Sequence, residues 1–280
     1  MLQTRSEKLA LVYHNITPSS YYLGNDPEFA AALQWGRHEL SLLQPLVSAA
    51  FADSQFNAED LAQYGYTDIV QLAAGVNPFR LKFEPTDSRL IGELHSHFPD
   101  GYILAVSQVI PHKRMELAIE AVHLLRTVHR LNVGLVIAGP QRNERYARDL
   151  AKLRSRLPEA NVLMMGETTE SQLATLYRAC AVYFGTSDHE GLAIPPLEAM
   201  AAGAPVVIRG TGAVPETVGN AALVAKPEAT ICELTEMLHA VLTNSKLRAT
   251  LVMRGREHVR NFYAQDTTQV FLQKIQELAS

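Results

Sequence analysis

Short apolar runs and longer amphipathic segments alternate along the chain, and the alternation is most regular after residue 100. Apolar runs predict six buried strands, at 102–108, 133–138, 162–165, 181–184, 205–208 and 221–225. Helical patterns lie between and after them, at 115–130, 144–156, 170–180, 195–202, 215–218, 229–243 and 246–262. Strands and helices that alternate in this way favour an α/β fold with a doubly wound parallel sheet.

The first 80 residues predict a smaller unit of the same kind. Strands are expected at 9–13, 49–52 and 68–73, helices at 28–48 and 57–64, and a turn at 75–78. Residues 79–100 are mixed and polar, which indicates a linker with one short helix. A last helix is expected at 266–278. We therefore divide the chain into residues 1–88, residues 89–262 and a final segment, 263–280.

Composition narrows the function further. The chain has 280 residues, of which 47% are apolar and 19% charged, and its net charge is −4. No long basic run is present, so a nucleic-acid partner is not expected. No apolar run is long enough to span a bilayer, which favours a cytoplasmic protein and leaves a peripheral membrane contact open. The two cysteines, Cys180 and Cys232, are expected to be reduced and buried.

The most informative stretch is residues 187–200, where an acidic loop joins a predicted strand to a short helix. Pro195-Pro196 fits the first helical turn, and Gly203 fits the helix end. Backbone N–H groups at a helix N-terminus form an anion site. Glu190 and Glu198 lie eight positions apart on either side of it. Carboxylates beside an anion site suggest a ligand that carries both phosphate and hydroxyl groups.

The spacing of these two glutamates within EGLAIPPLEAMAAGAPVV resembles the signature of the retaining nucleotide-sugar glycosyltransferases with the GT-B fold, glycosyltransferase family four. The resemblance is strongest over residues 100–225. It implies two Rossmann-like domains that face a cleft, with the final segment crossing back to the first domain. It also implies a nucleotide-diphosphate-sugar donor, a glycan or lipid-linked acceptor of an envelope pathway, retention of anomeric configuration, and no required metal or cofactor.

The same resemblance assigns catalytic roles to Lys113, Glu190 and His14. Lys113 would neutralise the leaving diphosphate, which a helix dipole of about half a charge cannot do alone. Glu190 would bind hydroxyls of the donor sugar, and His14 would lie near the reacting centre. The family has an arginine where this chain has Gln108. We hypothesise that Arg114 supplies the missing charge.

Further residues are implied in donor binding. Glu198 would accept from the ribose hydroxyls, and the backbone after Glu190 would contact the sugar and phosphate, where a glycine permits close approach. Two loops that follow strands would open on the same cleft. The full set of expected donor-binding residues is Ser107, Gln108, Arg114, Gly139, Gly166, Glu167, Gly191, Leu192, Ala193, Ile194 and Glu198.

The first domain is shorter than the resemblance implies, with about three strands where roughly twice that number is expected. Strand 9–13 would then expose an unpaired edge. Either another protein completes this domain, or the chain is a shortened form. The alternative function is therefore a nucleotide-sugar-binding subunit that depends on a partner. A dehydrogenase is disfavoured, because Pro215 stands where the Gly210-Thr211-Gly212 motif needs a third glycine. His95 and His97 have a metal-like spacing but no third ligand.

Overall fold

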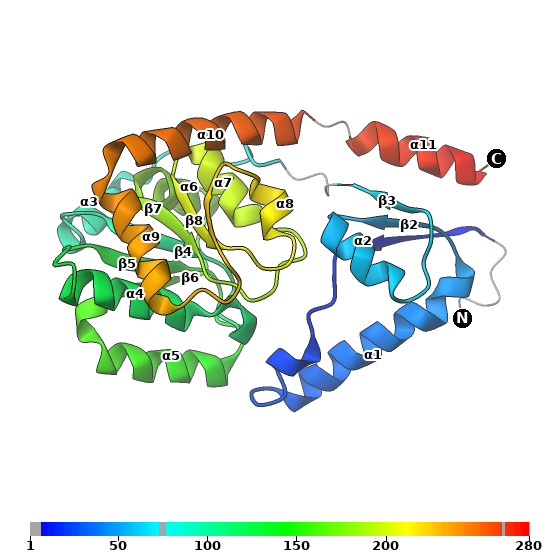
Figure 1. The fold of residues 1–280 in the computed structure, drawn as a ribbon, viewed down its shortest axis with the longest axis horizontal. Helices are drawn as coiled ribbons and strands as arrows, with labels where there is room; N and C mark the ends of the chain where they lie inside the picture. Colours follow the sequence, from blue (N-terminus) through cyan, green and yellow to red (C-terminus); the bar gives the residue numbers. More distant parts are fainter. Residues whose placement is uncertain (1–6, 73–76, 265–266, 280) are drawn as a thin grey trace.

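The chain forms two α/β units that lie side by side (Figure 1). The structure, a computed structural model, describes residues 7–72, 77–264 and 267–279. Every strand pair among these residues is parallel. The predicted α/β class is therefore confirmed.

The larger unit is built on a six-stranded sheet. Its strands are β4 (Tyr102–Val106), β5 (Gly134–Ala138), β6 (Val162–Gly166), β7 (Val182–Gly185), β8 (Val206–Arg209) and β9 (Leu223–Ala225). Their order is β6-β5-β4-β7-β8-β9. In this doubly wound arrangement, β5 and β6 are added on one side of β4 and β7 to β9 on the other, so the strand order switches between β4 and β7. Ligands bind at the carboxyl ends of the strands beside such a reversal.

Helices cover both faces of this sheet. They are α3 (Ser88–His97), α4 (Met115–Thr127), α5 (Glu144–Arg156), α6 (Glu170–Ala179), α7 (Ile194–Ala202), α8 (Val214–Val218), α9 (Ile231–Thr243) and α10 (Ser245–Tyr263). Successive strand residues point to opposite faces, so Leu104 joins the core under α3, α6 and α7, while Ile103 joins the core under α4, α5 and α9. Both residues are fully buried. This is why the strands are continuous apolar runs.

Side-chain caps fix where several of these helices begin. Thr169 accepts from the backbone N–H of Gln172, and the Gln172 side chain accepts in return from the Thr169 N–H. Thr230 forms the same reciprocal box at the start of α9. Gly203 ends α7 with a φ of 88°, a left-handed conformation that glycine adopts without cost. The helix end predicted at Gly203 is confirmed.

The smaller unit contains β1 (Leu9–Tyr13), β2 (Val47–Ala52) and β3 (Ile69–Gln71), with helices α1 (Pro27–Leu43) and α2 (Gln55–Ala62). The strand order is β1-β2-β3, so within the described residues β1 pairs on one side only. The unpaired edge expected for strand 9–13 is therefore present in this part of the chain. The predicted end of the third strand at Ala73 and residues 75–76 of the predicted turn lie outside the described residues.

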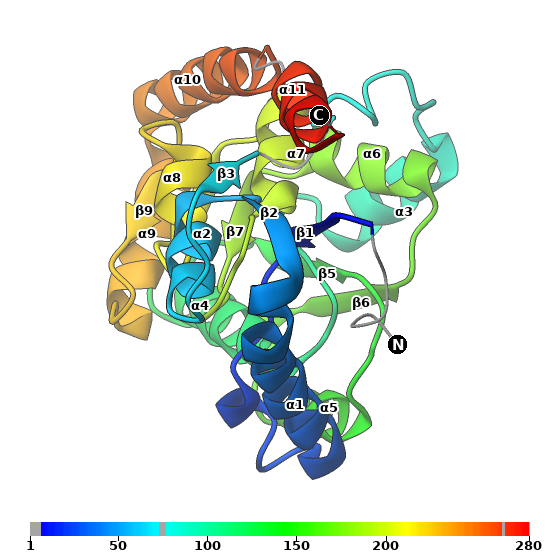
Figure 2. The same cartoon turned by 90° about the vertical axis from the view of Figure 1, so that its right-hand side faces the viewer.

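Two segments connect the units. Helix α11 (Thr267–Ala279) lies against the smaller one (Figure 2). There Phe271 packs on Phe51, with ring centroids 5.0 Å apart. Lys274 Nζ also contacts Asp68 at 2.7 Å. The segment after residue 77 instead packs against the larger unit, since Leu81 is buried in the core of that unit. The connecting segment is thus fixed to the larger unit from this point onward.

Candidate functional site

The candidate site lies at the carboxyl ends of β4 and β7, where the strand order of the sheet switches. The loop after β4 ends in a single 3₁₀ turn, Pro111–Lys113, and Arg114 then starts α4 in a left-handed conformation, with a φ of 51°. The loop after β7 comes back across it, since Thr186 Oγ1 donates to the carbonyl of Lys113 at 2.7 Å. The two loops that carry most of the predicted residues are therefore bonded to each other.

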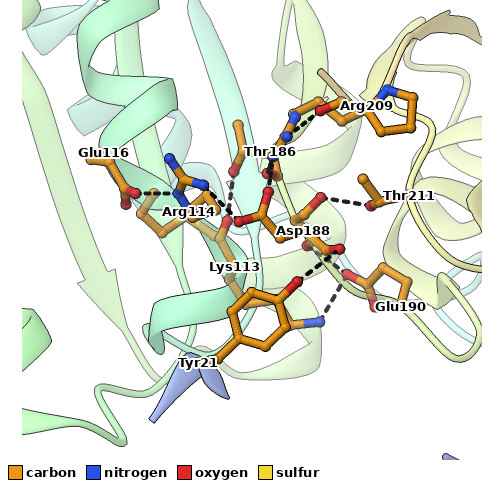
Figure 3. Close-up of polar contacts among 12 residues, drawn as sticks. Tyr21, Lys113, Arg114, Glu116, Thr186, Asp188, Glu190, Arg209 and Thr211 are labelled. Atoms are coloured by element: carbon orange, nitrogen blue, oxygen red, sulfur yellow. Dashed lines mark hydrogen bonds and ion pairs between the residues drawn. The ribbon is translucent and has the colours of Figure 1, made fainter. Parts of the chain in front are cut away.

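Lys113 and Glu190 meet at the centre of this arrangement (Figure 3). Lys113 Nζ lies 2.8 Å from Glu190 Oε1, and Ser187 Oγ donates to the same oxygen at 2.6 Å. The side chains are 17% and 16% exposed, so the pair is largely shielded but still reachable from solvent. Hydrogen bonds between charged partners are roughly twice as strong as neutral ones. The pair forms a preformed polar centre that a ligand could enter.

Asp188 anchors the acidic loop beside this pair. Arg114 contacts one of its carboxylate oxygens at 2.6 Å, and Arg209 contacts the other (Figure 3). Arg114 also bonds Glu116. Burial lowers the pKa of Arg114, but the bonds to the two carboxylates outweigh this effect and leave the pKa raised. In the structure, the charge of Arg114 is thus compensated within the protein.

Glu198 lies in α7 and is only 5% exposed. Its Oε1 accepts from Arg80 Nε at 2.6 Å, and its Oε2 accepts from the Tyr177 hydroxyl at 3.0 Å. Burial and the nearby carboxylate raise the pKa of Tyr177 well above its usual range, so this phenol stays a donor. Arg80 also pairs with Glu170 at 2.6 Å. Glu198 is therefore a buried carboxylate held by partners from the connecting segment and α6.

The start of α7 carries no side-chain cap. Its N-cap is Ala193, which offers no side-chain acceptor, and the helix proper begins at Ile194 with prolines following. Backbone N–H groups of a first helical turn have no partner within the helix. Pro195 and Pro196 have no N–H, so within this first turn the N–H groups of Ala193 and Ile194 are the donors that an anion could meet, between Glu190 and Glu198 in the chain.

The smaller unit supplies the opposite wall. His14 Nδ1 lies 2.7 Å from Asp53 Oδ2, and the imidazole is 65% exposed while the Asp53 side chain is 8% exposed. Burial raises the pKa of Asp53, an effect that the bond to His14 partly offsets. A Cβ on Gly191 would lie 2.7 Å from Asn15 Cβ, so only glycine fits between the two units. Ser54 Oγ also donates to the Gly191 carbonyl at 2.7 Å.

A cavity of about 620 Å³ lies between the two units, within the size range of small-molecule sites. Asp53 and Leu192 are among its lining residues, whereas Lys113, Glu190 and Glu198 are not, so this cavity lies beside the Lys113–Glu190 contact and does not contain it. Glu216 lies on its rim and bonds the backbone N–H groups of Gln55 and Phe56, at 2.8 and 3.0 Å. The carboxylate of α8 thereby caps α2 across the boundary between the units.

The remaining predicted residues line the same sheet edge. Gly139 must be glycine, because a Cβ there would lie 2.0 Å from the Ser107 carbonyl oxygen, and its N–H donates to the Gly166 carbonyl at 2.8 Å. Gln108 is exposed, next to Ser107. Glu167 is also exposed and pairs with Arg142 at 3.3 Å, apart from the Lys113–Glu190 contact.

Sequence reasoning missed five residues that organise the site: Asp53, Arg80, Asp188, Arg209 and Glu216. Asp53 had the same signal as His14, a polar residue directly after an apolar strand. Arg80 and Arg209 had none, because their partners lie 118 and 21 positions away in the chain. Gly212, which belongs to the rejected dinucleotide motif, instead lets the loop pass under Glu190, where a Cβ would lie 2.3 Å from the Glu190 carbonyl oxygen.

Residues 95–258 match the family described as glycosyl transferases group 1. Because this match covers more than half of the chain, the protein belongs to that family. The finding confirms the resemblance noted in the sequence, and the order of the strands agrees with the GT-B fold.

Several curated relatives carry mannosyltransferase names. The chain is 28% identical over 223 residues to the serotype-specific mannosyltransferase WbdA of Escherichia coli, an alignment that covers 76% of this chain and 26% of WbdA. It is 30% identical over 160 residues to a GDP-mannose-dependent monoacylated α-(1-6)-phosphatidylinositol monomannoside mannosyltransferase of Corynebacterium glutamicum, covering 55% of this chain and 41% of the relative. The chain therefore spans less than half the length of each.

Among solved structures, Anabaena HepE in complex with UDP and glucose superposes with a TM-score of 0.77 at 19% identity. The match covers 97% of this chain and 71% of HepE, and it supports the GT-B fold. Within the described residues, no helix is both long and apolar enough to cross a membrane.

Proposed function

We propose that the protein transfers a sugar, specifically mannose, from a nucleotide-diphosphate-sugar to a glycan or lipid-linked acceptor with retention of anomeric configuration. The observation that carries the proposal is the contact between Lys113 and Glu190 beside the uncapped start of α7. A cation, a carboxylate and free backbone N–H groups match the diphosphate and hydroxyl groups of such a donor. The names of the WbdA and Corynebacterium relatives support mannose, and the second supports GDP as the carrier.

In the proposed complex, the diphosphate binds to Lys113 and to the first turn of α7. Glu190 then exchanges its bond with Lys113 for hydroxyl groups of the sugar, and Glu198 accepts from the ribose. The buried position of Glu198, 5% exposed, favours a fixed acceptor over a solvated charge. Arg114 would add a further positive charge if the diphosphate draws it from Asp188.

The proposed reaction breaks the bond between the anomeric carbon and the phosphate oxygen through an oxocarbenium-like state. The acceptor hydroxyl attacks from the same face and passes its proton to the departing diphosphate oxygen, which keeps the electron pair of the broken bond. Lys113 and the α7 N–H groups stabilise the charge that develops on the diphosphate. His14, held by Asp53 on the opposite wall, would lie near the reacting carbon and orient the acceptor. No metal takes part in this scheme.

The alternative function, a nucleotide-sugar-binding subunit, is motivated by one feature, the edge of β1 that has no partner strand among the described residues. A chain whose first sheet has three strands in the described residues could act as a nucleotide-sugar-binding subunit that needs a protein partner to transfer. Such a subunit would bind donor and yet transfer nothing by itself. It would use the same donor residues, so binding alone does not separate the two functions.

A transfer assay with radiolabelled GDP-mannose distinguishes the transferase from the binding subunit. The purified chain is incubated with the donor and mannose-terminated oligosaccharide or lipid acceptors, and labelled product and released GDP are both measured. We expect transfer that falls at least about 100-fold in Lys113→Ala, with Lys152→Ala on the exposed face of α5 as the matched control. Donor binding without transfer or GDP release would favour the partner-dependent subunit. Absence of both would contradict the proposed function.

A further inference from the structure

A cluster of metal-ligating side chains lies away from the cleft, on the outer face of the larger unit. His129 follows the end of α4, and Glu236 and His239 lie one turn apart on α9. Their potential ligand atoms all lie within 4.8 Å of one another. Helices α4 and α9 pack side by side in both views of the fold (Figures 1 and 2).

The ligand atoms of the three side chains lie close together. His129 Nε2 lies 2.9 Å from Glu236 Oε1, and His239 Nδ1 lies 4.0 Å from Glu236 Oε2. The two imidazole rings are stacked, with centroids 4.1 Å apart and an angle of 19° between their planes. The carboxylate therefore faces two imidazole nitrogens, one from the turn after α4 and one from α9.

The backbone holds His129 in this position. The chain turns sharply after α4, where Arg130 adopts a left-handed conformation with a φ of 60° and the Leu131 N–H donates to the Leu125 carbonyl at 3.0 Å. Such a bond closes a helix end firmly. The His129 side chain is 18% exposed, and the His239 side chain is 33% exposed. An ion could reach the site without opening the core.

We propose that His129, Glu236 and His239 bind a divalent transition-metal ion of the Zn²⁺ class. Two imidazoles and one carboxylate form a ligand set that suits Zn²⁺ and its neighbours better than Mg²⁺ or Ca²⁺, which prefer oxygen. Tetrahedral coordination at about 2.1 Å places ligand atoms about 3.4 Å apart. The ligand atoms lie up to 4.8 Å apart, so metal binding requires the side chains to rotate closer and the two stacked rings to turn toward the ion.

The ion would tie the end of α4 to α9 and leave one coordination position for water. Lys113 precedes the start of α4, and the 13-residue helix carries His129 about 20 Å away from it. The metal would therefore act on stability, separately from the proposed transfer reaction. This inference does not depend on the proposed function, and it concerns residues that the motif of the two glutamates does not include.

The test is a Co²⁺ titration of the untagged full chain after chelator treatment, followed by visible absorption and by competition with Zn²⁺. We expect one saturable site per chain, and at a hundred times Kd a melting temperature that rises by at least about 5 °C. His129→Ala and His239→Ala should each weaken binding at least about tenfold. Glu236→Gln, at a side chain that is 64% exposed, should do the same while keeping the fold.

His123→Ala is the matched control. This histidine also lies on α4, with its Nδ1 3.7 Å from Glu159, but it has no second imidazole beside it in the described structure. The control should keep the wild-type affinity, and far-UV circular dichroism in chelator should be the same for all variants. The proposal is overturned if no saturable binding occurs, if the His129 and His239 variants bind as tightly as the wild type, or if His123→Ala loses binding equally.

Discussion

Lys113 Nζ lies 2.8 Å from Glu190 Oε1, although the two residues are 77 positions apart in the chain. The contact forms because the strands that precede them, β4 and β7, are neighbours in the sheet. It brings the expected phosphate-binding cation onto the expected sugar-binding carboxylate. In the absence of a donor, each of the two charges therefore has a partner, and donor binding must exchange one contact for another.

Lys113→Ala should weaken GDP binding about 10- to 100-fold, because it removes a charge-assisted bond of about 1.5–3 kcal/mol to the diphosphate. Guanosine, which has no phosphate, should bind both proteins equally. Isothermal titration of the two ligands measures the difference, with Lys152→Ala as the control variant. An equal loss for GDP and guanosine would mean that Lys113 acts through the fold and not through the phosphates.

Glu198→Ala should weaken GDP and guanosine alike, by about tenfold, because its proposed partner is the ribose. The check is a 2′,3′-dideoxy analogue of GDP, which lacks the hydroxyl groups. The analogue should bind the wild type weakly, and its affinity should fall little further in the variant. Such non-additive losses are expected when both changes remove the same interaction. If the variant weakens the analogue by the full tenfold, Glu198 does not contact the ribose.

Arg114→Ala tests whether this residue supplies the charge that Gln108 lacks. The hypothesis predicts that GDP affinity falls at least about fivefold while guanosine affinity is kept. Arg114 already bonds Asp188 and Glu116, so its charge can hold the loop, bind the diphosphate or do both, and the variant distinguishes these roles. Unchanged GDP affinity would show that Arg114 only holds the loop. Arg142→Ala, at an exposed arginine paired with Glu167, is the matched control.

Stability should fall in acid partly because of His112. Burial, with repulsion from Lys113 and His189, lowers the pKa of His112 to about 3. An unfolded histidine has a pKa of about 6.5, so between these values the unfolded chain takes up a proton that the folded chain refuses. The free energy of unfolding then falls with decreasing pH, by up to about 1.4 kcal/mol per pH unit.

Urea unfolding at pH 7, 6 and 5 measures this effect. His112→Asn lacks the titrating group, so the difference in unfolding free energy between pH 6 and pH 5 should be smaller in the variant by about 1 kcal/mol. Equal pH slopes for the two proteins would argue that His112 is protonated in the folded state.

Glu216→Ala should loosen the boundary between the two units. The carboxylate caps α2 by accepting from the N–H groups of Gln55 and Phe56, and loss of a helix cap typically costs about 1 kcal/mol. Hydrogen exchange at these two amides should become faster, and the melting temperature should fall by roughly 2–4 °C. Glu93→Ala removes an exposed pair with Arg89 and should change neither quantity. Unchanged exchange would contradict the cap.

Most of the fold could be predicted from hydrophobic patterning. The helix expected at 144–156 coincides with α5, and the strand at 9–13 coincides with β1. The patterns are clear here because a buried parallel strand is a continuous apolar run and a covering helix is amphipathic. Other observed boundaries differ from the predicted ones by a few residues. The helix expected at 28–48, for example, ends at Leu43, and the residues after it form a 3₁₀ turn and the start of β2.

The site was predictable only in part. Glu190 and Lys113 could be placed in one cleft, because the loops that carry them follow strands of a single parallel sheet. The contact between Arg80 and Glu198 could not be placed in this way, since it depends on how the connecting segment packs against α6 and α7. The Glu216 cap could not be foreseen either, because it depends on the orientation of one unit relative to the other.

The most direct test of the central claim, that the site around Lys113 and Glu190 binds a nucleotide-sugar donor, is a titration of the wild-type chain with GDP, UDP and ADP. We expect saturable GDP binding with one site per chain, with UDP and ADP weaker, and a thermal stabilisation of about 2.7 kcal/mol at a hundred times Kd. Preference for UDP would keep the site and overturn the choice of GDP-mannose. Absence of binding by all three nucleotides would contradict the account.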